Sequence, residues 1–345
     1  MPICGFHCKR GGGAREKVPF DVCLRECATL GPFPPCGTDY SILRGIALHN
    51  RQPAPLTETT VTQITGCLTK TWLERTTPEI YVRPEAWWYR FRGQIAHLVA
   101  ARYPYPGAVV ERRFRAPLNG GDWTISGQPD TLEPFGLAAE ALPDITVPPR
   151  KKLYLAPWNA EVWPEATCAH CDQPPLFVAR YREQQPPAYV AALCAEHFEA
   201  ERTAARVYHR LLEWKTTRWV PKEIYAHHQR QLIAYFVLAE KAGLPVRDVR
   251  AVYMDMGMQR TISYPLPLSK VPQYWQEWLV PQAEDLLTAL NDGFVPEPGP
   301  LHEDWECSRC DVAFLCGYRT RKQSKPRRKG TTRRAAAVEV LAEAA

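Results

Sequence analysis

The chain has 345 residues, 45% of them hydrophobic, which is usual for a globular protein of one large domain or two ordinary ones. No apolar run is long enough to span a membrane, and the first residues lack the apolar core of a secretory signal, so we expect a cytoplasmic protein with no membrane partner. The formal net charge of +6 is local, because residues 319–334 hold nine Lys or Arg and the rest of the chain is nearly neutral.

The twelve cysteines predict metal sites, because clustered cysteines in a chain of the cytoplasm favour metals over disulfides. Residues 1–40 are rich in Cys, Gly and Pro and too poor in apolar residues to fold well without a cross-link. Two Cys-x3-Cys pairs predict a zinc site there, with His7 and Cys36 as substitute ligands, at Cys4, Cys8, Cys23 and Cys27. The alternative is a disordered arm with free thiols.

From residue 41 the hydrophobic pattern predicts alternating helices and strands. We expect helices at 41–50, 60–76 and 84–103, strands at 108–116 and 123–132, a strand around 211–215, a helix at 222–242, strands at 247–255 and 259–266, and a helix at 273–292 disturbed by Pro281. Cys67 falls in the middle of the second helix. Pro129 favours a strand end or edge, since proline cannot donate to a sheet ladder.

Residues 133–208 break this pattern and are expected to form an insertion between two strands of one sheet, as a lobe near the cleft. A Cys-x2-Cys pair and a Cys-x2-His pair, separated by 22 residues, match a four-ligand zinc site formed by Cys168, Cys171, Cys194 and His197. Zinc there is expected either to stabilise the lobe alone or to shape a finger that contacts DNA.

The chemistry centres on the strand around 211–215, Leu-Leu-Glu-Trp-Lys. Side chains alternate along a strand, so Glu213 and Lys215 share one face and Leu212 and Trp214 the other. A carboxylate beside an ammonium suits a divalent metal and the water that it activates. Glu-x-Lys is common by chance, so this interpretation depends on the motifs before and after it.

Three such motifs follow the chain in order: Arg92-Gly93-x3-His97, Gly127-x-Pro129-Asp130 and, after the Glu-x-Lys strand, Gln231-x3-Tyr235. Together they resemble the PD-(D/E)XK nuclease superfamily in its RecB-like branch. Pro-Asp and Glu-Trp-Lys spell the signature of the superfamily, and Gln-x3-Tyr is particular to the branch. The resemblance covers about residues 41–318, apart from the insertion. It implies an α/β restriction-endonuclease-like fold, a mixed sheet flanked by helices.

The resemblance also implies roles for these residues. It implies that the ligands of a divalent metal are His97, Asp130, Glu213 and the backbone carbonyl of Trp214. Oxygen-rich ligands suit Mg²⁺ or Mn²⁺, and a histidine nitrogen favours Mn²⁺. Lys215 is implied to hold the attacking water and to offset charge in the transition state. Gln231 and Tyr235 are implied to face the same cleft and to contact DNA or brace the site. Arg92 either touches a phosphate or forms a structural ion pair.

The C-terminal cysteines make the chain similar to one group within the RecB-like branch. Cys307-x2-Cys310-x5-Cys316, with Cys67 far upstream, resembles the iron–sulfur members of the branch, which include the AddB nuclease domain and the CRISPR-associated exonucleases of the Cas-four family. The resemblance implies that these four cysteines hold a 4Fe–4S cluster that joins the two ends of the nuclease domain. From spacing alone, a second zinc site is the alternative.

We therefore expect a metal-dependent DNase, an exonuclease that acts on DNA ends or single strands. CRISPR spacer processing beside an integrase complex fits the family, and a phage or DNA-repair exonuclease like AddB is the alternative. A non-catalytic DNA-binding scaffold belongs to another class, and the intact acid–acid–lysine set argues against it. Residues 319–345 are expected to be a disordered basic tail that either holds nucleic acid electrostatically or is only solvated.

Overall fold

The computed structural model describes residues 3–8, 15–29, 43–44, 55–82, 93–95, 97–98, 101–118, 120–142, 145, 147–148, 151–181, 188–217, 219–255, 257–258, 260–269, 271–303, 306–307 and 310–317. The predicted basic tail, Arg92, Cys36 and most of the helices expected at 41–50 and 84–103 lie outside these residues. Within them, no helix combines the length and the apolar character needed to cross a membrane.

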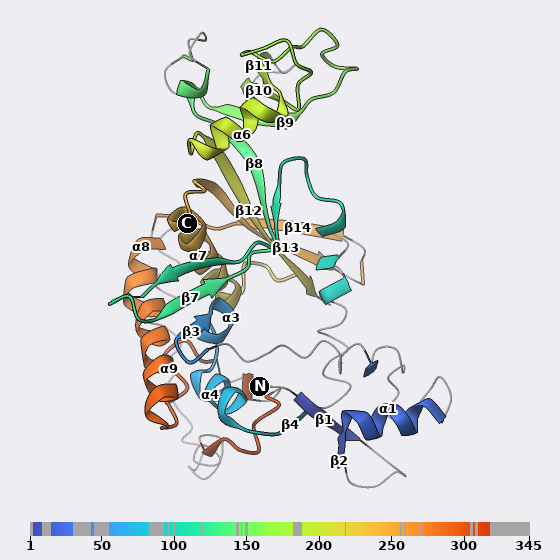
Figure 1. Cartoon of the computed structure of the whole chain (residues 1–345), viewed down its shortest axis with the longest axis vertical. Coiled ribbons are helices and arrows are strands. Elements are labelled where there is room, and N and C mark those ends of the chain that lie inside the picture. The colour runs from blue at the N-terminus through green and yellow to red at the C-terminus, as the bar shows by residue number, and fades with distance from the viewer. Residues whose placement is uncertain are drawn as a thin grey trace.

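A mixed sheet of eight strands runs through the molecule in the order β11-β10-β9-β8-β12-β13-β14, with β5 paired to β8 (Figure 1). The strands β12 and β13 are parallel, and the other neighbours are antiparallel. The strand bounds are β5 (Val109–Val110), β8 (Thr131–Leu137), β9 (Leu153–Pro157), β10 (Phe177–Tyr181), β11 (Tyr189–Leu193), β12 (Val207–Thr217), β13 (Val246–Asp255) and β14 (Arg260–Pro265). This mixed sheet flanked by helices agrees with the predicted α/β class.

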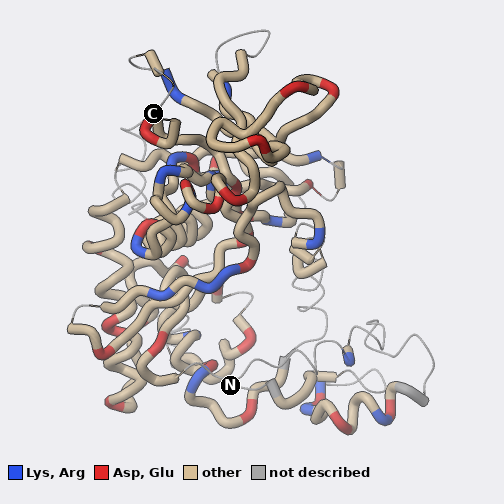
Figure 2. The backbone as a smooth tube through the Cα atoms, turned by 45° about the horizontal axis from the view of Figure 1, so that its top comes forward, with Lys and Arg blue, Asp and Glu red and all other residues tan. Residues whose placement is uncertain are grey.

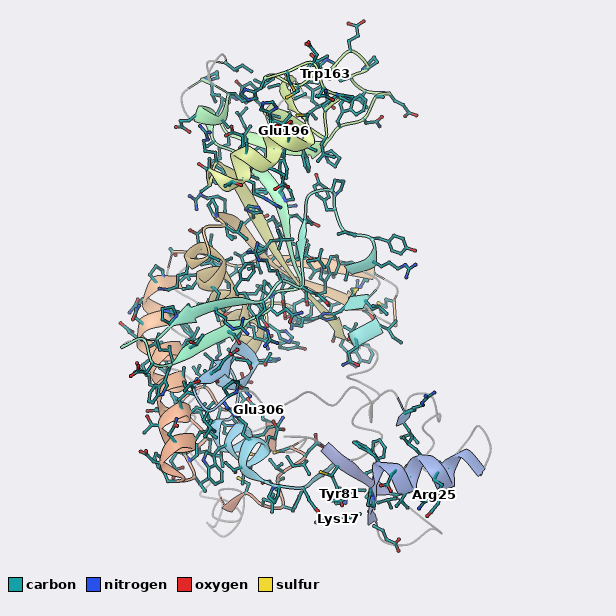
Figure 3. All side chains as sticks on the ribbon, in the orientation of Figure 1. Lys17, Arg25, Tyr81, Trp163, Glu196 and Glu306 are labelled. Carbon is teal, nitrogen blue, oxygen red and sulfur yellow. The ribbon has the colours of Figure 1, made fainter. Side chains whose placement is uncertain are left out.

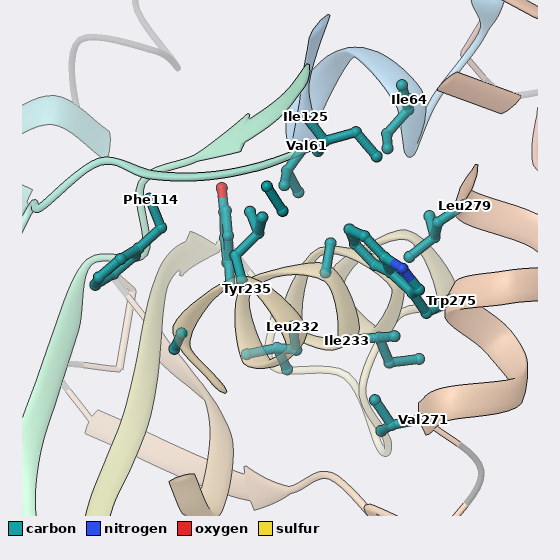
Figure 4. Close-up of a cluster of buried hydrophobic side chains, with 14 of the residues drawn as sticks. Val61, Ile64, Phe114, Ile125, Leu232, Ile233, Tyr235, Val271, Trp275 and Leu279 are labelled. Atoms are coloured by element: carbon teal, nitrogen blue, oxygen red, sulfur yellow. The ribbon is translucent and has the colours of Figure 1, made fainter. Parts of the chain in front are cut away.

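Helix α7 (Ala226–Lys241) makes the crossover that a parallel pair of strands requires, between β12 and β13. Its apolar side chains, among them Leu232, Ile233 and Tyr235, pack into the largest core together with Phe114, Ile125 and Trp275 (Figure 4). Gly243, at φ 79°, follows the helix in the left-handed conformation that commonly ends helices. Burial of this face holds α7 against the sheet.

A second sheet lies over α7 in the strand order β3-β7-β6, with bounds β3 (Glu58–Thr60), β6 (Phe114–Pro117) and β7 (Thr124–Gly127). Helices α3 (Val61–Ile64) and α4 (Leu68–Thr76) follow β3. On the side of the core, α8 (Val271–Tyr274), a π-helical turn (Trp275–Leu279) and α9 (Val280–Asp292) form one continuous helical rod (Figure 1).

Gly127 permits the close contact between β7 and α7. A Cβ atom at this position would lie 2.7 Å from Leu238 Cδ1, 2.8 Å from Val61 Cγ2 and 3.0 Å from Tyr235 Cδ1. We expect Gly127→Ala to lower the free energy of unfolding by about 1–3 kcal/mol, because the core must shift to admit the methyl group. Denaturant unfolding measures this, with Gly317→Ala as the control, since a Cβ there meets nothing within 4 Å. Equal stability of both variants would contradict the packing argument.

The insertion forms a lobe at one end of the molecule, where β9, β10 and β11 are covered by α6 (Ala195–Thr203) (Figure 1). Its strands continue the main sheet, because β9 pairs with the last two residues of β8. The expected boundaries at 133 and 208 therefore fall inside β8 and β12 rather than between strands. Val207 is the cross-strand partner of Leu137, so the chain leaves and re-enters the sheet at neighbouring points.

The N-terminal segment forms a third sheet, β2-β1-β4, with bounds β1 (Ile3–Cys8), β2 (Glu16–Pro19) and β4 (Ile80–Val82), followed by α1 (Phe20–Thr29) after β2. Its core joins distant parts of the chain, because Phe6 and Val18 pack with Leu73 of α4 and with Val312. Lys17 lies over the ring of Tyr81 at 5.3 Å, and Figure 3 shows the two side by side.

Three expected elements are interrupted. The strand expected at 108–116 divides into β5 and β6, which belong to different sheets. The other two interruptions have identifiable reasons. The helix expected at 60–76 breaks between Ile64 and Leu68, so Cys67 is the N-cap of α4 and not the middle of a helix. Gly66 has low helix propensity, and Leu68 donates its N–H to the carbonyl of Pro298 instead. The strand expected at 123–132 splits into β7 and β8, which belong to different sheets, at the segment that contains Pro129.

The prediction of a disturbed helix at 273–292 is confirmed. Pro281 occupies the first turn of α9, directly after the π-helical turn Trp275–Leu279. A proline lacks the N–H that an α-helix needs at its interior positions, so the backbone changes its hydrogen-bond pattern before this residue. The helix at 222–242 and the strands at 247–255 and 259–266 are confirmed within a few residues, as α7, β13 and β14.

Candidate active site

The residues Glu213 and Lys215 lie side by side on β12, as their spacing predicts. Lys215 Nζ is 2.7 Å from Glu213 Oε1, and Glu213 is only 3% exposed. The strand belongs to the centre of the main sheet, and at Glu213 and Lys215 its backbone is paired with β13. An ammonium group thus meets a buried carboxylate on a rigid element.

Asp130 completes the acid pair at the point where two strands separate. The ladder between β8 and β12 ends at the pair Thr131 and Leu212. One residue further, the carboxylate of Asp130 replaces the ladder, since its Oδ2 accepts the N–H of Trp214 at 2.7 Å. The N–H of Asp130 points to Glu213 Oε2 at 3.4 Å. The separation of the strands therefore brings both carboxylates together.

His97 reaches the same place from a separate helical segment. Its Nδ1 lies 2.7 Å from Asp130 Oδ1, and this contact raises the pKa of the imidazole, against the opposing effect of burial. Gly93 lies one turn earlier, and a Cβ there would be 3.6 Å from Thr216 Oγ1, so the segment runs close to β12. We call His97, Asp130, Glu213 and Lys215 the acid–lysine site.

Burial dominates the electrostatics of this site. The pKa of Glu213 is raised to about 7, mainly by burial and also by Asp130, while Lys215 and His97 act in the opposite direction. Two carboxylates are thus held together in a desolvated position at a free-energy cost that a bound cation offsets.

We expect Mn²⁺ affinity to rise with pH because of Glu213. The folded protein favours the protonated form of Glu213. This preference stabilises the fold fully below the ordinary pKa of 4.5, and the stabilisation is lost as the pH rises through about 7. A cation reverses this preference, and binding should be about tenfold tighter at about pH 8 than at about pH 6. Calorimetric titration at both values tests this, with Glu213→Gln as the variant that loses the dependence. Equal affinities in the unaltered protein would contradict it.

The two residues of the Gln-x3-Tyr motif do not lie in one environment. Gln231 lines a groove of about 420 Å³, and its buried Oε1 has no hydrogen-bond partner among the residues that the structure describes. Tyr235 is 4% exposed and packs in the core against Gly127. The expectation that Tyr235 faces the cleft is therefore wrong, because its face of α7 is the one covered by β7; it can brace the site only from beneath.

His227 was missed by the sequence analysis. It lies one helical turn before Gln231 on α7 and lines the same groove. Burial lowers the pKa of His227, while Glu303 raises it and Lys215 lowers it, so the imidazole stands between the acid–lysine site and the C-terminal segment. The i, i+4 spacing from Gln231 was the available signal.

Residues 200–317 match the model of the PD-(D/E)XK nuclease superfamily. These residues form a PD-(D/E)XK nuclease domain. Members of the superfamily are generally metal-dependent nucleases. No curated protein matches the chain. Among solved structures the chain is similar to the crystal structure of SSO0001, with 16% sequence identity and a TM-score of 0.41, over 78% of this chain and 89% of that one.

The matched part of the nuclease domain contains Glu213, Lys215 and Gln231, whereas Asp130 and His97 precede it. The geometry described above connects the two parts, since Asp130 contacts Trp214 and His97 contacts Asp130.

The four cysteines that were expected to hold an iron–sulfur cluster line one pocket. Its walls are formed by Cys67, Lys70, Pro298, His302, Glu306, Cys307, Cys310, Val312, Ala313 and Cys316. Cys67 Sγ accepts the N–H of Lys70 at the start of α4. Burial raises the pKa of the Cys310 thiol to about 11, so a thiolate there requires a compensating cation. We call this the four-cysteine pocket.

The predicted zinc residues of the insertion are gathered in the lobe. The ligand atoms of Cys168, Cys171, Cys194 and His197 all lie within 4.8 Å of one another, and no other set of three or more such residues does so in the described part of the chain. His197 Nδ1 lies 3.2 Å from Cys194 Sγ. Cys194 is the N-cap of α6, which places His197 one turn into the helix. The Cys3His set can hold one metal ion.

The structure does not bring the predicted second zinc set together. Cys4 and Cys8 are four residues apart on the extended strand β1, which places their Cα atoms about 13 Å apart, too far for a single ion. Cys23 and Cys27 lie one turn apart on α1 with their sulfurs 3.7 Å apart, and both are buried with Cys8 in the N-terminal core. These thiols serve as apolar side chains there, so the ligand set Cys4, Cys8, Cys23 and Cys27 is not assembled.

Proposed function

We propose that this protein is a divalent-metal-dependent deoxyribonuclease that hydrolyses phosphodiester bonds at DNA ends or in single-stranded DNA. The observation that carries the proposal is the acid–lysine site, where residues from three separate segments meet at the separation of β8 and β12. A match of the surrounding domain to a nuclease superfamily supports the same reaction.

The donor atoms of the site fit Mn²⁺ or Mg²⁺. Two carboxylates held close together in a buried position favour a hard cation, and a histidine nitrogen favours Mn²⁺. His97 Nδ1 and Asp130 Oδ1 lie 2.7 Å apart, close enough for both atoms to bind one cation. When bound, the metal supplies polarisation of the scissile phosphate and a water of lowered pKa. The Trp214 carbonyl stays a proposed fourth donor.

The residues of the chain then have separate tasks. The N–H of Trp214 fixes one oxygen of Asp130, and His97 fixes the other, so this carboxylate keeps a single orientation. Lys215 holds the attacking water and places a positive charge where the phosphate gains negative charge in the transition state. Its contact with Glu213 keeps the ammonium group in position before substrate arrives.

A cleavage assay on single- and double-stranded DNA, labelled separately at each end, tests the function. We expect cleavage with Mn²⁺ or Mg²⁺ and none with EDTA, and the order in which labelled products appear gives the direction of degradation. Protein that retains its metals but cleaves neither substrate would favour a non-catalytic DNA-binding scaffold. CRISPR spacer processing with an integrase complex, and phage or repair processing of DNA ends, stay predictions from the family resemblance.

We further propose a 4Fe–4S cluster in the four-cysteine pocket. Four thiolates are the usual ligands of such a cluster, and all four predicted cysteines line the same cavity. Their sulfurs are not gathered within 4.8 Å, as those of a one-ion site are, and a cluster of four irons needs the wider spacing. The cluster would join α4, near the start of the nuclease fold, to its last segment.

For the lobe we propose a zinc ion with a structural role. Its tip, residues 157–176, contains Glu161, Glu165 and Asp172 but no Lys or Arg, and Figure 2 shows acidic positions on these loops. Such a surface repels a phosphate backbone, so the DNA-contacting finger is disfavoured. The lobe also joins the far end of β8, about 20 Å along the strand from Asp130.

We expect Cys194→Ser to remove zinc from the lobe and lower its stability. Cys194 contributes one of four ligands, and at the N-cap position of α6 its side chain makes no capping hydrogen bond, so the effect of the substitution is on the metal. Metal analysis should find roughly one zinc ion per chain before the change and none after it, and limited proteolysis should then cut within residues 151–206. Full zinc content in the variant would contradict the proposed ligand set.

A further inference from the structure

His302 lies inside the four-cysteine pocket although it belongs to no motif recognised in the sequence. Its side chain is 5% exposed, and its Nε2 lies 3.5 Å from Cys307 Sγ. The backbone fixes its place, since the N–H of His302 donates to the carbonyl of Gly299. Gly299 has φ +86° and is so close to Leu68 and Gln282 that no side chain fits there. The histidine is therefore presented to the pocket by a tight, constrained turn.

Glu306 stands on the other side of the imidazole. Its Oε2 lies 3.8 Å from His302 Nδ1 and accepts the N–H of Cys67 at 3.1 Å, while its Oε1 accepts the N–H of Glu303 at 3.3 Å. Figure 3 shows Glu306 beside the start of α4. The Glu306 carboxylate thus holds the backbone at Cys67 and also lies beside the His302 ring, which faces Cys307. At 3.8 Å this contact is longer than a hydrogen bond and does not set which ring nitrogen carries the proton, so the tautomer with N–H on Nε2, 3.5 Å from Cys307 Sγ, fits the geometry.

We infer that His302 donates its Nε2–H to the Cys307 thiolate and raises the reduction potential of the cluster. The inference rests on the proposed iron–sulfur cluster. A hydrogen bond to a ligand sulfur withdraws negative charge from it, which stabilises the reduced cluster more than the oxidised one, because the reduced form carries the extra electron. His302 is then a positioning residue for the electronic state of the cluster and not one of its four ligands.

The alternative role for His302 is that of an iron ligand in place of one of the four cysteines. A ligand exchange of that kind would also change the potential, so the two roles must be separated by retention of iron. Glutamine separates them, because its side-chain amide retains an N–H donor of similar reach but does not readily coordinate iron. Phenylalanine keeps the volume of the ring and removes the donor.

The test uses the full chain purified without oxygen. Iron and sulfide are counted, and the potential is measured by titration with dithionite and redox mediators while the visible absorption is recorded. We expect His302→Phe to keep its iron and to show a lower potential, and His302→Gln to lie near the unaltered protein. Resonance Raman spectra in H2O and D2O provide a second measurement, since the donated N–H predicts an isotope shift of the iron–sulfur bands in the unaltered protein.

Two results would overturn the inference while leaving the cluster in place: an unchanged potential in His302→Phe, or loss of iron from both variants, which would make the histidine a ligand. Should His302→Phe fail to fold, absence of the isotope shift in the unaltered protein overturns it equally. Protein that holds zinc in this pocket removes the cluster itself, and the inference with it, whereas the nuclease assay with Mn²⁺ reports separately on the acid–lysine site.

Discussion

Lys215→Ala is expected to lower the rate of DNA cleavage by about 10²–10³-fold, the usual cost of removing one charged group that stabilises a transition state. The ammonium group lies 2.7 Å from a buried carboxylate on a strand that is paired with β13, so it is in place before substrate binds. Removing it should affect the chemical step and leave DNA affinity nearly unchanged. Single-turnover cleavage and fluorescence anisotropy with labelled DNA measure these quantities separately.

Lys222→Ala is the matched control, because it removes the same charge from an exposed position a few residues after β12. Its cleavage rate should equal that of the unaltered protein. Thermal unfolding of both variants shows whether the fold is kept when Glu213 loses its contact with Lys215. Unchanged cleavage by folded Lys215→Ala would refute the proposed mechanism.

Cys67→Ser is expected to remove the brown colour and to lower the melting temperature. An iron–sulfur protein absorbs near ~400 nm, and a cluster that loses one of four thiolates is not retained. Cys67 lies on α4 and the other three cysteines lie at the end of the described chain, so the cluster would close a very long loop and restrict the unfolded chain. Visible absorption, iron content and calorimetry together measure the effect.

Cys4→Ser provides the control for this experiment. Cys4 lies on β1 with its thiol directed to the carbonyl of Pro78, and it does not line the four-cysteine pocket. Its absorption and melting temperature should match those of the unaltered protein. If the purified protein is colourless and contains two zinc ions, one of them lost in Cys67→Ser, the pocket is a zinc site and the iron–sulfur proposal is wrong.

Local patterns in the sequence were sufficient for much of the nuclease domain. The alternation on β12 placed Glu213 beside Lys215, and Pro129 marked the point where one strand ends and Asp130 becomes available. The helix at 222–242 followed from its apolar periodicity and its closing glycine. Cysteine spacing identified four residues that the lobe gathers into a set able to hold a metal ion, Cys168, Cys171, Cys194 and His197.

Features that depend on contacts between distant residues were not accessible in this way. The core position of Tyr235 depends on β7 crossing α7 at Gly127, which no helical pattern indicates. The Cys-x3-Cys spacing looked alike in two places, but an extended strand separates Cys4 from Cys8 whereas a helical turn joins Cys23 to Cys27. His302 depends on a turn whose constraint comes from another part of the chain.

The cross-strand pairing of Leu137 with Val207 has a further consequence. The strands β8 and β12 are the two arms of one hairpin, and residues 138–206 occupy the place of its turn. Such an arrangement adds little loop-closure entropy, because the inserted unit begins and ends at adjacent points. The acid–lysine site occupies the open end of the hairpin and the lobe its closed end, so evolution could enlarge, exchange or delete the lobe without altering the register that brings Asp130 to Glu213.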